Sequence, residues 1–147
     1  MALTTDDLVE IQQLYAKYSH ALDGGITELF LSVWAPDGVF TQEGRTRNGH
    51  EELRVMGSRA ADEVGRHRHF ICNVMIDGDG DHATGSCYLY LTRDVKQEPL
   101  IGIYSDTLVK LDGRWVFKTR EVRGDNRRVS EKYREQQAAW KAAGLPV

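Results

Sequence analysis

The chain has 147 residues, of which 41% are hydrophobic and 28% charged, and its formal net charge at pH 7 is −3. This length favours one domain over residues 1–147 with a core of its own. Interspersed acids and bases offer no basic field for nucleic acid, and the apolar runs are far shorter than the roughly 20 residues of a membrane span. The N-terminus lacks the pattern of a signal peptide and the two cysteines are typical of reduced thiols, so we expect a cytoplasmic protein.

The first half of the chain carries helical patterns. Apolar side chains spaced three and four residues apart predict a helix over residues 5–22, with threonines before it as N-caps and a glycine pair after it. Asp23 then lies at the C-terminal end of this helix, where the helix dipole disfavours a carboxylate. It is either a solvated end residue or a carboxylate kept for a function.

Three more elements precede the long strands. They are a short helix over 26–34, a strand over 39–42 and a third helix over 50–63, with a polar hairpin or loop before the third helix.

The stretch 66–91 predicts two strands joined by the turn Gly78-Asp79-Gly80-Asp81. With a four-residue turn and regular pairing, one face of this hairpin carries His69, Asn73, Ser86, Tyr88 and Tyr90. The opposite face carries Phe70, Cys72, Val74, Ile76, Cys87 and Leu89, with both cysteines as small buried packing residues. A slip of one residue would exchange the two faces, because side chains alternate along a strand.

Asp112-Gly113 predicts a second hairpin, between strands over 100–111 and 114–123. The expected facing pairs are Lys110 with Trp115, Leu108 with Phe117, and Asp106 with Thr119. Both faces of this hairpin carry apolar side chains. We therefore expect helices on one face and a second copy of the chain on the other, in a homotrimer or homodimer.

A polar loop and a C-terminal helix are predicted after the last strand, which gives a core of about 5–123 and a helical extension of about 126–144. Near this junction the arginines are Arg120, Arg123, Arg127 and Arg128. We expect these four arginines to face solvent or a second subunit. The alternative is that they clamp an anion, such as a substrate carboxylate or a conjugate.

Helices that are segregated from a run of antiparallel strands indicate the α+β class. A strongly twisted antiparallel sheet wrapped around three helices forms a cone with one open end, and a C-terminal helix completes the expected fold. The interior of such a cone is a natural site for a small molecule.

Four stretches of the chain carry a resemblance to a known family. They are YAKYSHALDGG in the first helix, LFLSVWAPDGVF after it, RHFICN before the Gly/Asp turn, and YSDTLVKLDGRWVFKTREV in the last hairpin. Together they resemble the SnoaL-like branch of the NTF2-like (cystatin-like) superfamily, which includes scytalone dehydratase, bile-acid 7α-dehydratase and a dehydrochlorinase. The resemblance implies the cone fold over about residues 8–122.

The resemblance also implies a catalytic group. The His and Asp of the lyases in this branch match His69 and Asp23, and the substrate-polarising Tyr matches Tyr18. The expected substrate contacts are Trp34, Asn73, Tyr88 and Tyr90. Without the resemblance, a strand histidine is most often a hydrogen-bonded core residue, and Tyr18 is most often a core aromatic.

A second histidine takes part in scytalone dehydratase, and the candidate nearby in this chain is His82. We place His82 in the hairpin turn, pointing to solvent, and we place Arg66 and His67 at the mouth of the cone or in solvent.

These residue types support acid–base chemistry without a cofactor or metal. A carboxylate that accepts a hydrogen bond from one ring nitrogen of a histidine fixes the tautomer of the ring, and the other nitrogen can move a proton. We therefore expect a cofactor-independent lyase, a dehydratase, that acts on a small hydrophobic hydroxy-carbonyl compound. The alternatives are a non-catalytic small-ligand binder and an isomerase or hydrolase of the same fold.

Several other classes lack their motifs in this sequence. A glycine-rich phosphate loop after a strand, a twelve-residue calcium loop, a serine nucleophile elbow and an HExxH run are all missing.

Overall fold

The structure is a computed structural model that describes residues 1–94, 97–125, 135–136, 138–139 and 141–144. Its elements in chain order are α1 (Thr5–Asp23), α2 (Thr27–Ser32), β1 (Trp34–Gln42), β2 (Arg45–Asn48), α3 (Gly49–Ala61), β3 (Arg68–Asp79), β4 (His82–Thr92), β5 (Leu100–Leu111) and β6 (Arg114–Gly124). The six strands form one sheet in the order β2-β1-β6-β5-β4-β3.

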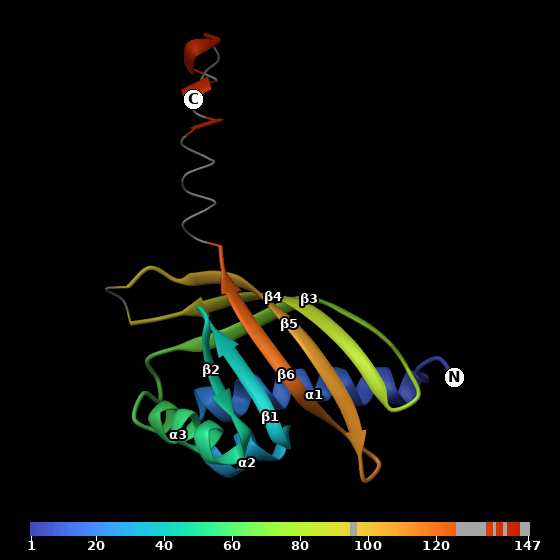
Figure 1. The fold of residues 1–147 in the computed structure, drawn as a ribbon. Helices are drawn as coiled ribbons and strands as arrows, with labels where there is room; N and C mark the ends of the chain where they lie inside the picture. Colours follow the sequence, from blue (N-terminus) through green and yellow to red (C-terminus); the bar gives the residue numbers. More distant parts are fainter. Residues whose placement is uncertain (95–96, 126–134, 137, 140, 145–147) are drawn as a thin grey trace.

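The sheet curves around the helices, as the α+β prediction required (Figure 1). Helix α1 crosses the concave side, where it contacts β3 and β6, and α2 and α3 lie together beside β1. The four long strands pair antiparallel, as predicted, whereas β1 pairs parallel with β6. The result is a cone whose interior is bounded by α1, α3 and the long strands.

Both ends of α1 are fixed. At the N-terminal end Thr4 and Asp7 form a capping box, and Asp7 also accepts hydrogen bonds from Lys110 Nζ at 2.7 Å and Trp115 Nε1 at 2.8 Å. The hydrogen bonds from Lys110, Thr4 and Trp115 hold the pKa of Asp7 well below its usual value. At the C-terminal end Gly24 caps the helix, so that Asp23 is its last residue.

The predicted register of the first long hairpin is wrong by two residues beside the turn and by one residue at His69. Beside the turn Asp79 pairs with His82, because the turn between β3 and β4 contains two residues rather than four. A bulge at Asn73 and Val74, with Asn73 at φ 54°, then shifts the pairing back by one residue, so that His69 pairs with Leu91 and Cys72 with Tyr88.

This register decides which side chains enter the cone. The inner face of the hairpin carries His69, Ile71, Val74, Ile76, Cys87, Leu89 and Leu91, and the outer face carries Phe70, Cys72, Met75, Tyr88 and Tyr90. The predicted face that joined His69 to Tyr88 and Tyr90 is therefore wrong. Cys87 is buried as expected, but Cys72 is exposed.

In the second hairpin two of the three predicted pairs are confirmed, Lys110 with Trp115 and Leu108 with Phe117. The third is wrong, because a bulge between Phe117 and Thr119 brings Arg120 opposite Asp106.

Arg120 is therefore not the solvated or subunit-facing residue that the sequence suggested. It is 1% exposed, and its Nε and Nη2 atoms each donate to an Asp106 oxygen at 2.8 Å. Burial alone lowers the pKa of Arg120, but the Asp106 carboxylate outweighs burial and raises it, so the guanidinium stays charged. Of the other predicted cluster members Arg123 is exposed, and Arg127 and Arg128 lie outside the described residues.

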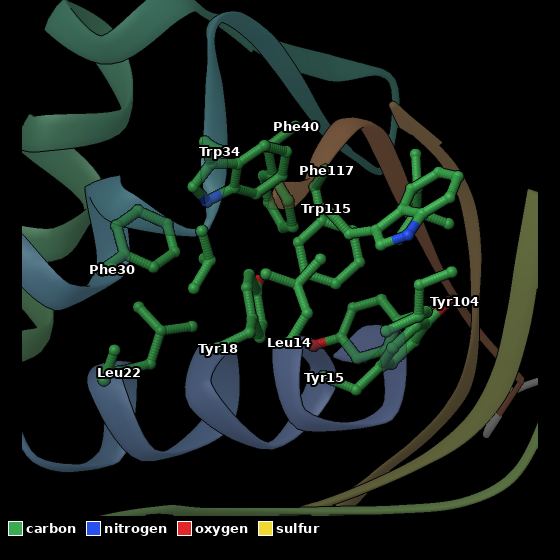
Figure 2. Close-up of a cluster of buried hydrophobic side chains, with 14 of the residues drawn as sticks. Leu14, Tyr15, Tyr18, Leu22, Phe30, Trp34, Phe40, Tyr104, Trp115 and Phe117 are labelled. Carbon is green, nitrogen blue, oxygen red and sulfur yellow. The ribbon is translucent and has the colours of Figure 1, made fainter. Parts of the chain in front are cut away.

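Aromatic side chains of the buried hydrophobic cluster shown in Figure 2 surround the Arg120 guanidinium. The Arg120 guanidinium carbon lies 4.8, 4.3, 4.1 and 4.0 Å from the ring centroids of Tyr15, Tyr18, Tyr104 and Phe117. The Tyr15 hydroxyl donates to Asp106 Oδ2 at 2.5 Å. Each ring therefore packs against a cation as well as against its apolar neighbours.

The predicted C-terminal extension falls largely outside the described residues. The residues of this extension that are described are helical at 135–136, 138–139 and 141–142. In the part of the chain that is described, none of the helices has the length and apolar character needed to cross a membrane.

We expect Arg120→Met to lower the free energy of unfolding by about 3–5 kcal/mol, because it leaves the Asp106 carboxylate buried without its counter-ion. The measurement is urea denaturation followed by circular dichroism. The double variant Arg120→Met/Asp106→Leu removes both charges and should recover at least about 1 kcal/mol of that loss. A double variant less stable than Arg120→Met would contradict this account.

Candidate active site

A cavity of about 470 Å³ opens between the C-terminal half of α1, helix α3 and the ends of the long strands. Its apolar lining consists of Leu22, Phe40, Met56, Ala60, Leu89, Leu91, Leu100 and Val122. Its polar lining near the interior consists of Tyr18, His67, His69 and Tyr104. A cavity that places convergent polar groups beside an apolar wall is the usual form of a small-molecule site.

His69 and Asp23 form a hydrogen-bonded pair at this cavity. His69 Nδ1 lies 2.6 Å from Asp23 Oδ1, and the backbone N–H of His69 donates to Asp23 Oδ2 at 2.9 Å. Both side chains are nearly buried, with 8% and 12% of their surface exposed. The end of α1 and the start of β3 thus hold each other through both carboxylate oxygens.

The protonation states of this pair follow from its contacts. Burial raises the pKa of Asp23, but the hydrogen bonds from the side chain and backbone of His69 outweigh burial and hold it below its usual value. An ionised carboxylate only accepts hydrogen bonds, so His69 carries a proton on Nδ1. In the neutral ring Nε2 then has a free lone pair, and His69 lines the cavity.

His67 also belongs to this site, although the sequence analysis placed it at the mouth or in solvent. Its Nε2 lies 3.7 Å from Asp23 Oδ1, its side chain is 14% exposed, and its ring centroid lies 5.6 Å from that of His69. Alternation along a strand could have found it, because residues two apart share a face. His82, the candidate second histidine, is exposed beside the β3–β4 turn, as expected, and does not line the cavity.

Two tyrosines form the inner wall. Tyr18 comes from α1 and Tyr104 from β5; the sequence analysis did not single out Tyr104. Burial, opposed by the charge of Arg120, raises the pKa of Tyr18 to about 12, so its hydroxyl is protonated at neutral pH. That hydroxyl is buried and has no hydrogen-bond partner among the described residues, while the Tyr18 side chain lines the cavity.

None of the four predicted substrate contacts lines the cavity. Trp34 is 2% exposed, and its ring packs behind those of Tyr18 and Phe40, at centroid distances of 6.1 and 6.4 Å. Tyr88 and Tyr90 are on the outer face of the sheet because of the one-residue register shift. Asn73 is exposed at the β3 bulge.

The side chains of Asp23, His67 and His69 together have the composition of a metal site. One ligand atom from each of Asp23, His67 and His69 lies within 4.8 Å of the others. Imidazole nitrogens and a carboxylate oxygen suit Zn²⁺ and other divalent transition metals. A metal bound by His69 Nδ1 would have to replace the proton that this nitrogen shares with Asp23. Because the three residues could hold a metal, the absence of a cofactor stays a prediction.

Asp23 should stabilise the fold in a pH-dependent way. Its pKa is lower in the folded chain than in the unfolded chain, so its contribution is present above about pH 4 and is lost as pH falls through the folded pKa. The measurement is the difference in unfolding free energy between the wild type and Asp23→Asn. We expect this difference to shrink between about pH 5 and pH 2.5. A difference that stays constant over this range would show that Asp23 is not held ionised by His69.

The sequence matches the SnoaL-like domain family over residues 4–121. No functionally curated protein matches it. The cone is the cystatin-like fold, also called NTF2-like, of similar solved structures.

Three of these structures show the range of the similarity. A protein of unknown function from Nostoc punctiforme is 29% identical, with a TM-score of 0.76 over 85% of this chain and 96% of its own. Rv3472, of unknown function, from Mycobacterium tuberculosis is 30% identical, with a TM-score of 0.76 over 82% and 72%. A candidate scytalone dehydratase from Novosphingobium aromaticivorans is 23% identical, with a TM-score of 0.73 over 81% and 84%. The match over most of the chain places this protein in the family of SnoaL-like domains.

Proposed function

We propose that this protein is a cofactor-independent lyase, a dehydratase that acts on a small hydrophobic hydroxy-carbonyl compound in the cone cavity. The observation that supports this most strongly is the His69–Asp23 pair, whose imidazole lines a cavity with an apolar wall. The similarity to a candidate scytalone dehydratase is consistent with this chemistry, although at 23% identity it establishes the fold alone.

In the proposed reaction His69 Nε2 takes a proton from the carbon beside the substrate carbonyl. The electron pair of that C–H bond forms an enolate, and the protonated Tyr18 hydroxyl donates a hydrogen bond to its oxygen. The enolate then collapses with formation of a carbon–carbon double bond and loss of the hydroxyl on the next carbon. The imidazolium returns its proton to that hydroxyl, so the products are an unsaturated carbonyl compound and water.

Asp23 and His67 support this cycle. Asp23 orients the His69 ring and stabilises the imidazolium that forms after proton transfer. His67 Nε2 lies 3.7 Å from the same carboxylate oxygen and helps to position Asp23.

The same pair would also support proton transfer without loss of water, as in an isomerase, and the same cavity would suit a binding protein. The three functions predict different outcomes. A dehydratase forms a product that is lighter by one water, an isomerase forms a product of unchanged mass, and a binding protein forms no product.

We expect His69→Ala to lower turnover by about 10²-fold or more, since general acid–base catalysis typically contributes that much. The test is a thermal-shift screen of hydroxy-ketones, sterols and polyketide-like aromatics, with mass spectrometry and chromatography of each hit. A hit that loses the mass of one water with wild type only would establish the dehydratase.

His82→Ala is the matched control, because His82 is exposed and outside the cavity, and it should retain full turnover. Turnover should also survive EDTA if no metal is needed. A product of unchanged mass but new retention time would favour the isomerase, and binding without any product would favour the binding protein.

We also propose that the chain assembles into a homodimer or homotrimer through the outer face of β3 and β4. Four large side chains there are 45–73% exposed: Phe70, Met75, Tyr88 and Tyr90. Neighbouring exposed apolar side chains on one sheet face are typical of a protein interface.

We expect the wild type to elute as an oligomer in size-exclusion chromatography with light scattering, and Phe70→Glu/Tyr88→Glu to elute as a monomer, because the variant buries two charges in the interface. Val9→Glu, at a 54% exposed position on α1, should keep the wild-type mass. A monomeric wild type would refute this interface.

A further inference from the structure

We infer that the ligand of this cavity carries an anionic group, a carboxylate or a phosphate, which arginines bind at the cavity mouth. This inference rests on the proposed substrate site and names the class of substrate. The arginines that line the cavity are Arg47, Arg59, Arg66 and Arg93.

The four arginines come from different parts of the chain. Arg47 lies on β2, Arg59 on α3, Arg66 in the loop before β3, and Arg93 just after β4. Arg47 is half-buried, with its guanidinium carbon 5.9 Å from the centroid of the Phe40 ring, and the other three are exposed. The fold thus brings four arginines from different elements to the lining of one cavity.

Within the described residues these four arginines form no ion pair, whereas other arginines of the chain do. Arg54 pairs with Glu28, Arg120 with Asp106, and Arg123 approaches Asp125 at 3.9 Å. A protein with a net charge of −3 has enough carboxylates to pair the arginines at the mouth as well.

The acids of the lining do not balance this charge. They are Glu63 and Asp94. Glu63 Oε2 lies 3.9 Å from His67 Nδ1. Four guanidinium groups against two carboxylates leave an excess of positive charge at the mouth. An arginine fork binds a carboxylate or phosphate with two parallel hydrogen bonds, so an anion is the chemistry that this arrangement recognises.

The deeper lining indicates the rest of the ligand. Behind the arginines the wall is apolar, with Leu22, Leu89, Leu91, Leu100 and Val122. His69 lines the same cavity and lies at the start of β3, just after the loop that carries Arg66. The arrangement fits an amphipathic acid whose apolar body enters the cone, whose reacting carbon reaches His69, and whose charge stays at the mouth.

The test is isothermal titration calorimetry with three probes that share one apolar body: 2-naphthoate, 2-naphthyl phosphate and the neutral 2-naphthamide. We expect at least one anion to bind the wild type about tenfold more tightly than the amide, or better, a preference that weakens at high salt. The stronger of the two anions identifies carboxylate or phosphate as the group recognised. Equal affinity for all three probes would overturn the inference.

The variant Arg59→Gln/Arg93→Gln should bring the dissociation constant of the preferred anion close to that of the amide and leave the amide unchanged. Arg45→Gln is the control, because Arg45 is exposed on the same strand as Arg47 but does not line the cavity. Circular dichroism would confirm that the variants fold. An anion preference that survives in the double arginine variant would also overturn the inference.

This experiment measures binding without chemistry, so its outcome is separable from that of the proposed reaction. Anion preference without turnover of any hydroxy-carbonyl acid would support the anion site and count against the dehydratase. Turnover of neutral hydroxy-ketones with no anion preference would support the dehydratase and refute the anion site.

Discussion

The buried ion pair between Arg120 and Asp106 is the constraint on which the interior of the cone depends. Removing two charges from water is costly, and the two parallel hydrogen bonds and the surrounding aromatic rings offset that cost. The pair also explains the bulge in β6, because without the extra residue Arg120 would not face Asp106. The position of Tyr18, against the face of this guanidinium, follows from the same interaction.

Helix α1 connects this buried core to the cavity. Asp7 joins its first turn to Lys110 and Trp115 on the last hairpin, and Asp23 joins its last residue to β3. Tyr18 lies between these two anchors and packs against the core while it lines the cavity. A helix held at both ends fixes the proposed base and the proposed hydrogen-bond donor relative to each other, which a pair of loops could not do as accurately.

The sequence predicted best where a local signal decides the structure. The apolar spacing gave α1 and therefore the position of Asp23, and the Asp112-Gly113 turn gave the near half of the last hairpin. The errors arose where the structure depends on an insertion that no local pattern marks. The β3 bulge at Asn73 placed His69 on the opposite face from Tyr88 and Tyr90, and the β6 bulge placed Arg120 inside. The role of Trp34 as a core residue depends on distant rings and could not be deduced from its neighbours in sequence.

The bulge in β3 divides that strand into two parts, and the positions that face inward differ between them. Before Asn73, odd-numbered residues such as His69 and Ile71 face inward, whereas after it even-numbered residues such as Ile76 do. A strand with uniform alternation could place either the imidazole or the apolar side chains near the turn inside the cone, but not both. The one inserted residue removes this conflict, so that both the imidazole and the apolar side chains near the turn face the interior of the cone.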